Sequence, residues 1–170
     1  MVREASTLTR LARLRREVAR DLSALDARSG ECASLLQSWN DASFISRAEL
    51  TLVAVNLHAY YTALETLLER VAVLLDEETP KGAAWHLELL DQMTVEVPGL
   101  RPAPVPEAIV ADLQELRRFR HFFRNAYVLD LDPLRVREHA RRLAQVHRPL
   151  RDSLMRFQTH LDDLIGGLQT

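Results

Sequence analysis

Apolar residues recur at steps of three and four along most of this 170-residue chain, and this periodicity limits the possible folds more than any other feature. In an α-helix, residues at these steps share one face, which can pack against a neighbouring helix. Only five glycines occur, and β-branched residues form no alternating run that would predict strands. With a hydrophobic fraction of 47%, the chain can build one core. We therefore expect a single all-α domain over residues 1–170.

The stripes predict an antiparallel bundle of four long helices and one short helix. The first helix starts near Leu8 and weakens or kinks at "ARSGE", residues 27–31, and "NDAS" at 40–43 offers a break. The second covers about 43–77, and a short one lies near 83–93. The inward stripe expected of the second helix is Ile45, Leu52, Val55, Ala59, Ala63, Leu67, Val71 and Leu74.

Prolines place the remaining boundaries. The segment "VEVPGLRPAPVPE" holds four of them and is expected to be an extended loop inside the domain. Pro106 suits the first turn of the next helix. Asp132 is expected to cap the last long helix, which Pro133 opens and Pro149 should kink.

The net charge and its distribution along the chain limit the functions that we expect. The net charge of −2 argues against binding nucleic acid by bulk attraction alone. However, residues 1–100 carry 10 basic and 15 acidic side chains, whereas residues 101–170 carry 12 and 9. An anion site is therefore expected in the C-terminal part. Cys32 is the only cysteine, and neither a signal peptide nor a membrane-spanning segment is evident, so we expect a cytoplasmic protein.

The stretch "LRRFRHFFRNAYVLDLDP", residues 116–133, concentrates arginines and aromatic residues. Residues four apart on a helix share a face, so several polar side chains should converge near one strip. Guanidinium groups suit phosphate, because their fixed fork donates two hydrogen bonds at once. The alternative is a half-buried helix whose phenylalanines face the core and whose arginines are solvated. The polar side chains of the strip are Arg117, Arg120, His121, Arg124, Asn125 and Tyr127.

The segment "FRHFFRNAY" resembles the signature of the HEPN superfamily, in particular that of its HepT-like ribonuclease toxins. Their motif is Arg, four arbitrary residues, His, one residue and Tyr, on a late helix of an all-α bundle. Here Arg120 and Tyr127 match, whereas position 125 is Asn instead of His. The segment "LHAYYTALETLLERVAVLLD", residues 57–76, is also similar to the second long helix of these proteins.

The resemblance implies a toxin of a toxin–antitoxin pair. In the family, the Arg and His of two subunits meet across a homodimer interface and cleave RNA without metal. By this analogy Arg120 and position 125 are the catalytic positions, and Arg117, His121 and Arg124 support RNA binding. A minimal nucleotidyltransferase serves as the antitoxin and in some cases adds AMP to the motif tyrosine, here Tyr127.

Asn125 changes what the resemblance implies. An amide has no usable pKa and cannot act as a general acid or base, so the chain should cleave RNA poorly or not at all. Three explanations stay open. The position was altered to permit expression of a toxic protein, the protein is a natural non-catalytic member, or His121 substitutes from one turn earlier.

Other chemistry finds little support in the sequence. No Glu-x-x-His pair, HExxH motif or Cys/His cluster occurs, so neither a metal nor a cofactor is expected. The segments "RREVAR" and "LETLLER" are interpreted as solvated helix surfaces with ion pairs. The alternative to the toxin is a non-catalytic helical module whose basic surface binds nucleotide, RNA or a partner protein.

Overall fold

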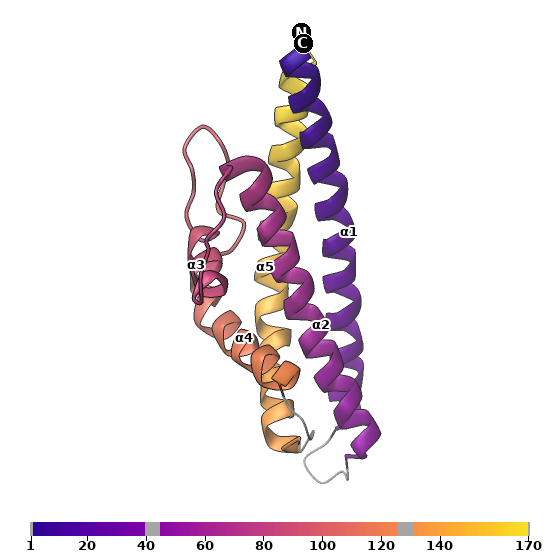
Figure 1. The fold of residues 1–170 in the computed structure, drawn as a ribbon. Helices are drawn as coiled ribbons and strands as arrows, with labels where there is room; N and C mark the ends of the chain where they lie inside the picture. The colour runs from indigo at the N-terminus through magenta and orange to yellow at the C-terminus, as the bar shows by residue number, and fades with distance from the viewer. Residues whose placement is uncertain (1, 40–44, 126–130, 170) are drawn as a thin grey trace.

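A computed structural model describes residues 2–39, 45–125 and 131–169, and the described chain consists of helices joined by loops (Figure 1). The only sheet-like pairing in these ranges is an isolated bridge between Val97 and Arg101. The prediction of an all-α bundle with four long helices and one short helix is confirmed. The helices are α1 (Val2–Ser38), α2 (Arg47–Val71), α3 (Trp85–Gln92), α4 (Val110–Asn125) and α5 (Pro133–Gly167).

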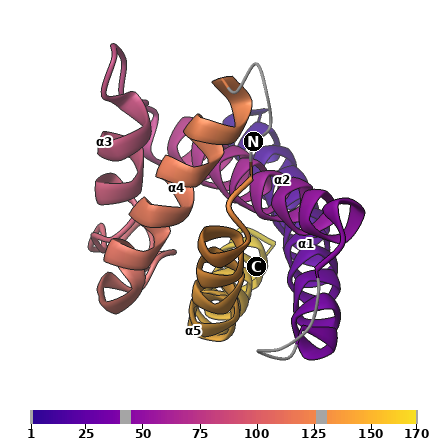
Figure 2. The same ribbon diagram turned by 90° about the horizontal axis from the view of Figure 1, so that it is seen from below.

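Successive long helices run in opposite directions (Figure 1). Helices α1 and α5 lie side by side along most of their length, and α2 packs against both (Figure 1). Helices α3 and α4 lie together on the side away from α1, where α4 contacts α2 and α5 (Figure 2). Helix α2 is therefore enclosed by neighbours on several sides, and its side chains meet those of every other helix.

Polar caps set two of the helix starts. Ser46 and Glu49 form a capping box at the start of α2, in which the Ser46 Oγ accepts from the Glu49 N–H at 3.2 Å. The Ser46 hydrogen bonds lower the pKa of the Glu49 carboxyl group. At α5, the Leu134 N–H donates to Asp132 Oδ1 at 2.9 Å, and Pro133 occupies the first helical turn. The predicted start of α5 is confirmed.

Helices α1 and α5 are both continuous at the places where the sequence predicts weakening or a kink. Helix α1 continues through 27–31 without a break, although a glycine inside a helix costs about 1 kcal/mol relative to alanine. Packing of α1 along α2 and α5 outweighs that preference. Helix α5 likewise continues through Pro149. The break predicted at 40–43 lies outside the described residues. Helix α2 ends in a π-helical turn, Ala72–Asp76, which no sequence signal indicated.

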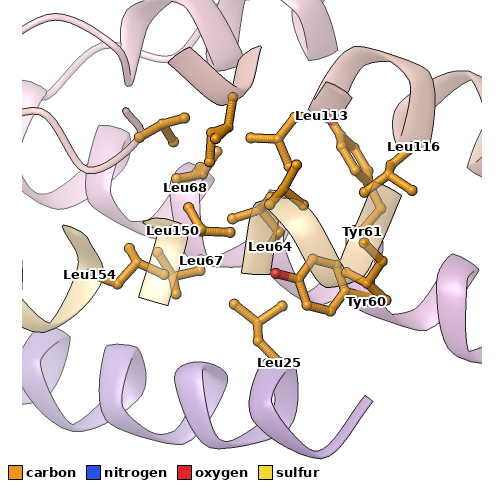
Figure 3. Close-up of a cluster of buried hydrophobic side chains, with 14 of the residues drawn as sticks. Leu25, Tyr60, Tyr61, Leu64, Leu67, Leu68, Leu113, Leu116, Leu150 and Leu154 are labelled. Atoms are coloured by element: carbon orange, nitrogen blue, oxygen red, sulfur yellow. The ribbon is translucent and has the colours of Figure 1, made fainter. Parts of the chain in front are cut away.

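The core lies where α1, α2, α4 and α5 meet, and Figure 3 shows its centre. Leucines supply most of the contacts, and two tyrosines of α2 place their rings among them. The residues labelled there are all buried: Leu25, Tyr60, Tyr61, Leu64, Leu67, Leu68, Leu113, Leu116, Leu150 and Leu154.

The predicted inward face of α2 was partly wrong. Leu52 and Val55 are 49% and 42% exposed, whereas the buried face passes through Leu50, Val53 and Leu57. Both sets are apolar and follow helical spacing, so periodicity alone could not choose between them. The choice is made by the position of α2 between its neighbours, which is a tertiary constraint.

A buried polar link joins α1, α2 and α5 behind this core. The His147 Nε2 lies 3.1 Å from Asp26 Oδ1, and the Tyr60 hydroxyl lies 3.1 Å from His147 Nδ1. These contacts fit a neutral ring that donates from Nε2 and accepts at Nδ1. Burial lowers the pKa of His147 despite the opposing effect of Asp26, and burial raises the pKa of Tyr60.

The proline-rich loop is fastened to the bundle by one arginine. Arg101 is 2% exposed, and its Nε and Nη2 each lie 2.6 Å from a carboxylate oxygen of Asp76. The same guanidinium donates to the carbonyls of Val95 and Gln92. These contacts hold the loop against the bundle.

The two faces of α2 can be compared with one matched pair of variants. Leu64 is fully buried, so Leu64→Ala should lower the free energy of unfolding by about 2–5 kcal/mol through lost contacts and a cavity. Leu52→Ala makes the same chemical change on the exposed face and should alter it by about 0.5 kcal/mol or less. Urea unfolding followed by circular dichroism measures both. Equal losses would contradict the observed orientation of α2.

Candidate functional site

Helix α4 carries the predicted strip, and its apolar residues determine which side of the strip faces inward. Leu113, Leu116 and Phe119 are buried against the core. Arg120 follows Phe119 on the same side and is only 9% exposed. The arginine that the family motif singles out therefore points toward α2 and away from the outer surface of α4.

Arg120 is held by two residues of α2. Its Nη2 lies 2.8 Å from Glu65 Oε2, and its Nε donates to Thr62 Oγ1 at 3.1 Å. The other Glu65 oxygen, Oε1, contacts His86 Nδ1 on α3. One buried carboxylate thus connects α2 with α3 and α4. This arrangement fixes the orientation of the guanidinium before any ligand arrives, and it offsets part of its charge.

His121 and Asn125 lie on the outer side of α4, and both are exposed. The Asn125 amide donates to the His121 carbonyl at 2.8 Å, and its Nδ2 lies 3.3 Å from His121 Nε2. The imidazole of His121 therefore reaches the tip of the Asn125 side chain, although the two residues are one helical turn apart. The predicted neighbourhood of His121 and position 125 is present in the structure.

The strip is consequently divided between two sides of α4. Arg120 makes its contacts with α2, whereas His121, Arg124 and Asn125 are exposed. No contact joins Arg120 to Asn125 among the described residues. Tyr127, the tyrosine of the motif, lies outside the described residues.

The three phenylalanines of α4 do not share one role. Phe119 is buried and Phe123 packs partly buried against the core, as the structural alternative predicted, but Phe122 is 53% exposed. The Phe123 ring lies 5.3 Å from the His58 ring of α2, measured between centroids. Burial, and then the charge of Arg120, lowers the pKa of His58 and favours its neutral form.

A cavity of about 410 Å³ lies between α3 and α4, beside His121. Its wall on α4 is cationic, and its wall on α3 is aromatic (the two helices are adjacent in Figure 2). The Arg118 guanidinium pairs with Glu115 of its own helix. The lining residues are Gly82, Ala83, Trp85, His86, Arg117, Arg118 and His121.

Sequence reasoning missed the residues that hold Arg120. The segment "LETLLER" was interpreted as a solvated surface with ion pairs, but Glu65 within it is buried. A signal was available: Thr62 and Glu65 stand three apart on one helix face, within an otherwise apolar run. His86 had no such signal, because it reaches Glu65 only through the placement of α3.

The architecture and the motif positions define a class: an all-α bundle whose late helix presents a partly buried arginine and, five residues later, an exposed polar position. A comparison with protein families matches residues 52–161 to a family described as "HepT-like protein", which covers more than half of the chain. The chain belongs to the HepT-like family, within the HEPN superfamily. Comparisons with curated proteins and with solved structures found no match.

The described residues form neither a cluster of metal ligands nor a membrane-spanning helix. Within residues 2–39, 45–125 and 131–169, no three His, Cys, Asp or Glu side chains gather closely enough to hold a metal ion. No helix in the described part of the chain is long and apolar enough to cross a membrane.

The Arg120–Glu65 pair should contribute to stability. Glu65→Gln removes the charge that compensates a buried guanidinium and should lower the free energy of unfolding by about 3 kcal/mol. Glu115→Gln is the matched control, because it breaks the more exposed pair with Arg118 and should cost about 0.5 kcal/mol or less. Urea unfolding at neutral pH measures both changes. A loss for Glu65→Gln as small as that of the control would contradict a structural role for the pair.

Proposed function

We propose that this chain is the toxin-type member of a HepT-like toxin–antitoxin pair, which acts in the cytoplasm as a homodimer and binds RNA along α4. Its site derives from a metal-independent endoribonuclease, and Asn125 leaves it with little or no cleavage activity. The observation that carries this proposal is the orientation of Arg120. Glu65 and Thr62 fix its guanidinium five residues before an exposed position 125.

The chemistry explains why these two positions matter. Cleavage of RNA without metal needs a base for the ribose 2′-OH proton and an acid for the leaving oxygen. It also needs a cation to stabilise the charge that develops on the phosphorus centre. An arginine with a fixed orientation suits the last task, because little reorganisation is required. The amide of Asn125 can hydrogen-bond to substrate, but it cannot transfer a proton at neutral pH.

Restoring the imidazole tests this assignment. Asn125→His should raise RNA cleavage by about 100-fold or more over the unaltered chain, the range in which general acid–base catalysis contributes. Asn125→Gln is the control, because it changes the side chain at the same exposed position without adding a group that titrates near neutral pH. Cleavage of a fluorogenic RNA and growth arrest on expression are the two measurements. If neither increases in Asn125→His, the ribonuclease assignment of this position fails.

A second candidate gives the catalytic role to His121. It is favoured by the 3.3 Å separation between His121 Nε2 and Asn125 Nδ2, which brings the imidazole to the place that residue 125 reaches. On this candidate the unaltered chain cleaves RNA, and His121→Gln should lower the rate by about 100-fold. The comparison of rates is made at equal RNA occupancy. Activity that survives His121→Gln would remove this candidate.

The antitoxin assignment concerns Tyr127 and does not depend on whether the chain cleaves RNA. A minimal nucleotidyltransferase partner would act on Tyr127 by forming a bond between the phenolic oxygen and the phosphorus of AMP, with pyrophosphate leaving from ATP.

The non-catalytic alternative, a helical module that binds RNA, nucleotide or a partner protein through the same surface, differs in one respect. It predicts binding that Asn125→His does not convert into cleavage.

A further inference from the structure

The Arg117 side chain of α4 has a hydrogen-bond donor that no described residue satisfies. It is half-buried on α4, and its Nε is enclosed with no hydrogen-bond partner among the described residues. An unpaired buried donor costs about 1–3 kcal/mol, so it is expected to have a partner at some stage of function. The cavity between α3 and α4, which Arg117 lines, is the space from which a ligand could approach its guanidinium.

The charges around this cavity favour an anion. Arg117 and Arg118 line it together with the imidazoles of His86 and His121. The two carboxylates that contact these groups are already engaged, since Glu115 pairs with Arg118 and the buried Glu65 pairs with Arg120 and His86. A phosphate group can accept hydrogen bonds from guanidinium and imidazole at the same time.

The opposite wall of the cavity is aromatic. Trp85 lines it, with its ring tilted by 31° against the His86 ring at a centroid separation of 3.6 Å. A tryptophan ring beside cationic side chains is a surface on which nucleobases stack without sequence preference. The volume of about 410 Å³ falls within the range of about 300–1,000 Å³ of small-ligand pockets, which suits one nucleotide.

The cavity is connected to both positions of the motif through residues that line it. His121 belongs to its lining and accepts from the Asn125 amide, so one wall continues directly into position 125. On the other side, His86 contacts Glu65, which holds Arg120. A nucleotide in the cavity would therefore lie next to the phosphodiester that the strip is proposed to bind.

We propose that the cavity between α3 and α4 is a subsite for one nucleotide, with its phosphate on Arg117 and its base stacked on Trp85. This inference rests on the proposed function, because the nucleotide in the cavity would be part of the RNA that binds along the strip. The same chemistry would recognise a free nucleoside monophosphate. The two sources are distinguished by the probes of the experiment.

The test measures binding of two probes, a fluorescein-labelled eight-nucleotide RNA and AMP, to the full chain and its variants. Arg117→Gln should weaken binding of both probes by about tenfold or more. Trp85→Leu should weaken AMP binding by at least about fivefold, the smallest loss expected for one stacked base, whereas Trp85→Phe should retain most of it. Arg156→Gln, which changes an exposed arginine of α5 outside the cavity, should alter either affinity by less than about twofold.

The outcomes separate the subsite from the proposed function. RNA binding that is unchanged in Arg117→Gln and Trp85→Leu overturns the subsite and leaves the proposed function standing. AMP binding that requires both residues, without RNA binding, supports the subsite and overturns the proposed function. If inorganic phosphate competes as well as AMP does, the role of Trp85 is overturned. If neither probe binds the unaltered chain, both proposals are overturned. Circular dichroism of each variant confirms that it is folded, and Arg117→Gln removes no core residue.

Discussion

One buried carboxylate organises the part of this protein that carries the motif. Glu65 of α2 receives the Arg120 guanidinium with one oxygen and contacts His86 of α3 with the other. A guanidinium at this depth requires such a partner, because an uncompensated buried charge costs several kcal/mol. The contact of α4 with α2 and the contact of α3 with α2 thus share one buried carboxylate. The apolar contacts around it are less specific, since leucines can repack at small cost.

The division of α4 into two sides follows from this constraint. Since Arg120 faces α2, the side chains on the neighbouring ridge of the helix, His121 and Asn125, are directed outward. Arg117 lies one turn before His121 and borders the cavity shared with α3. The inner side supplies a cation whose orientation is fixed. The outer side carries exposed polar groups, and position 125 on that side holds an amide in place of the imidazole of the motif.

The sequence alone predicted the architecture, but it predicted only part of the candidate site. Helical periodicity, the prolines and the Asp132 cap predicted the number of helices and the start of α5, because these signals are local. The inward face of α2 could not be chosen, since two apolar stripes were available and only the neighbouring helices decide between them. The resemblance to a short motif singled out Arg120 and position 125 as candidates. Glu65, which pairs with Arg120, and His86, which contacts Glu65, come from other helices. Their meeting depends on tertiary packing that no local pattern predicts.

We infer that Glu65 and Arg120 act as a pair that holds α4 on α2. A double-mutant cycle with Glu65→Gln, Arg120→Gln and the combined variant measures this most directly, as the coupling in the free energy of unfolding. The account predicts a coupling of about 1.5 kcal/mol or more, with the double variant more stable than the sum of the single losses implies. Additive losses, with a coupling below about 0.5 kcal/mol, would show that the two residues act independently and would contradict the account.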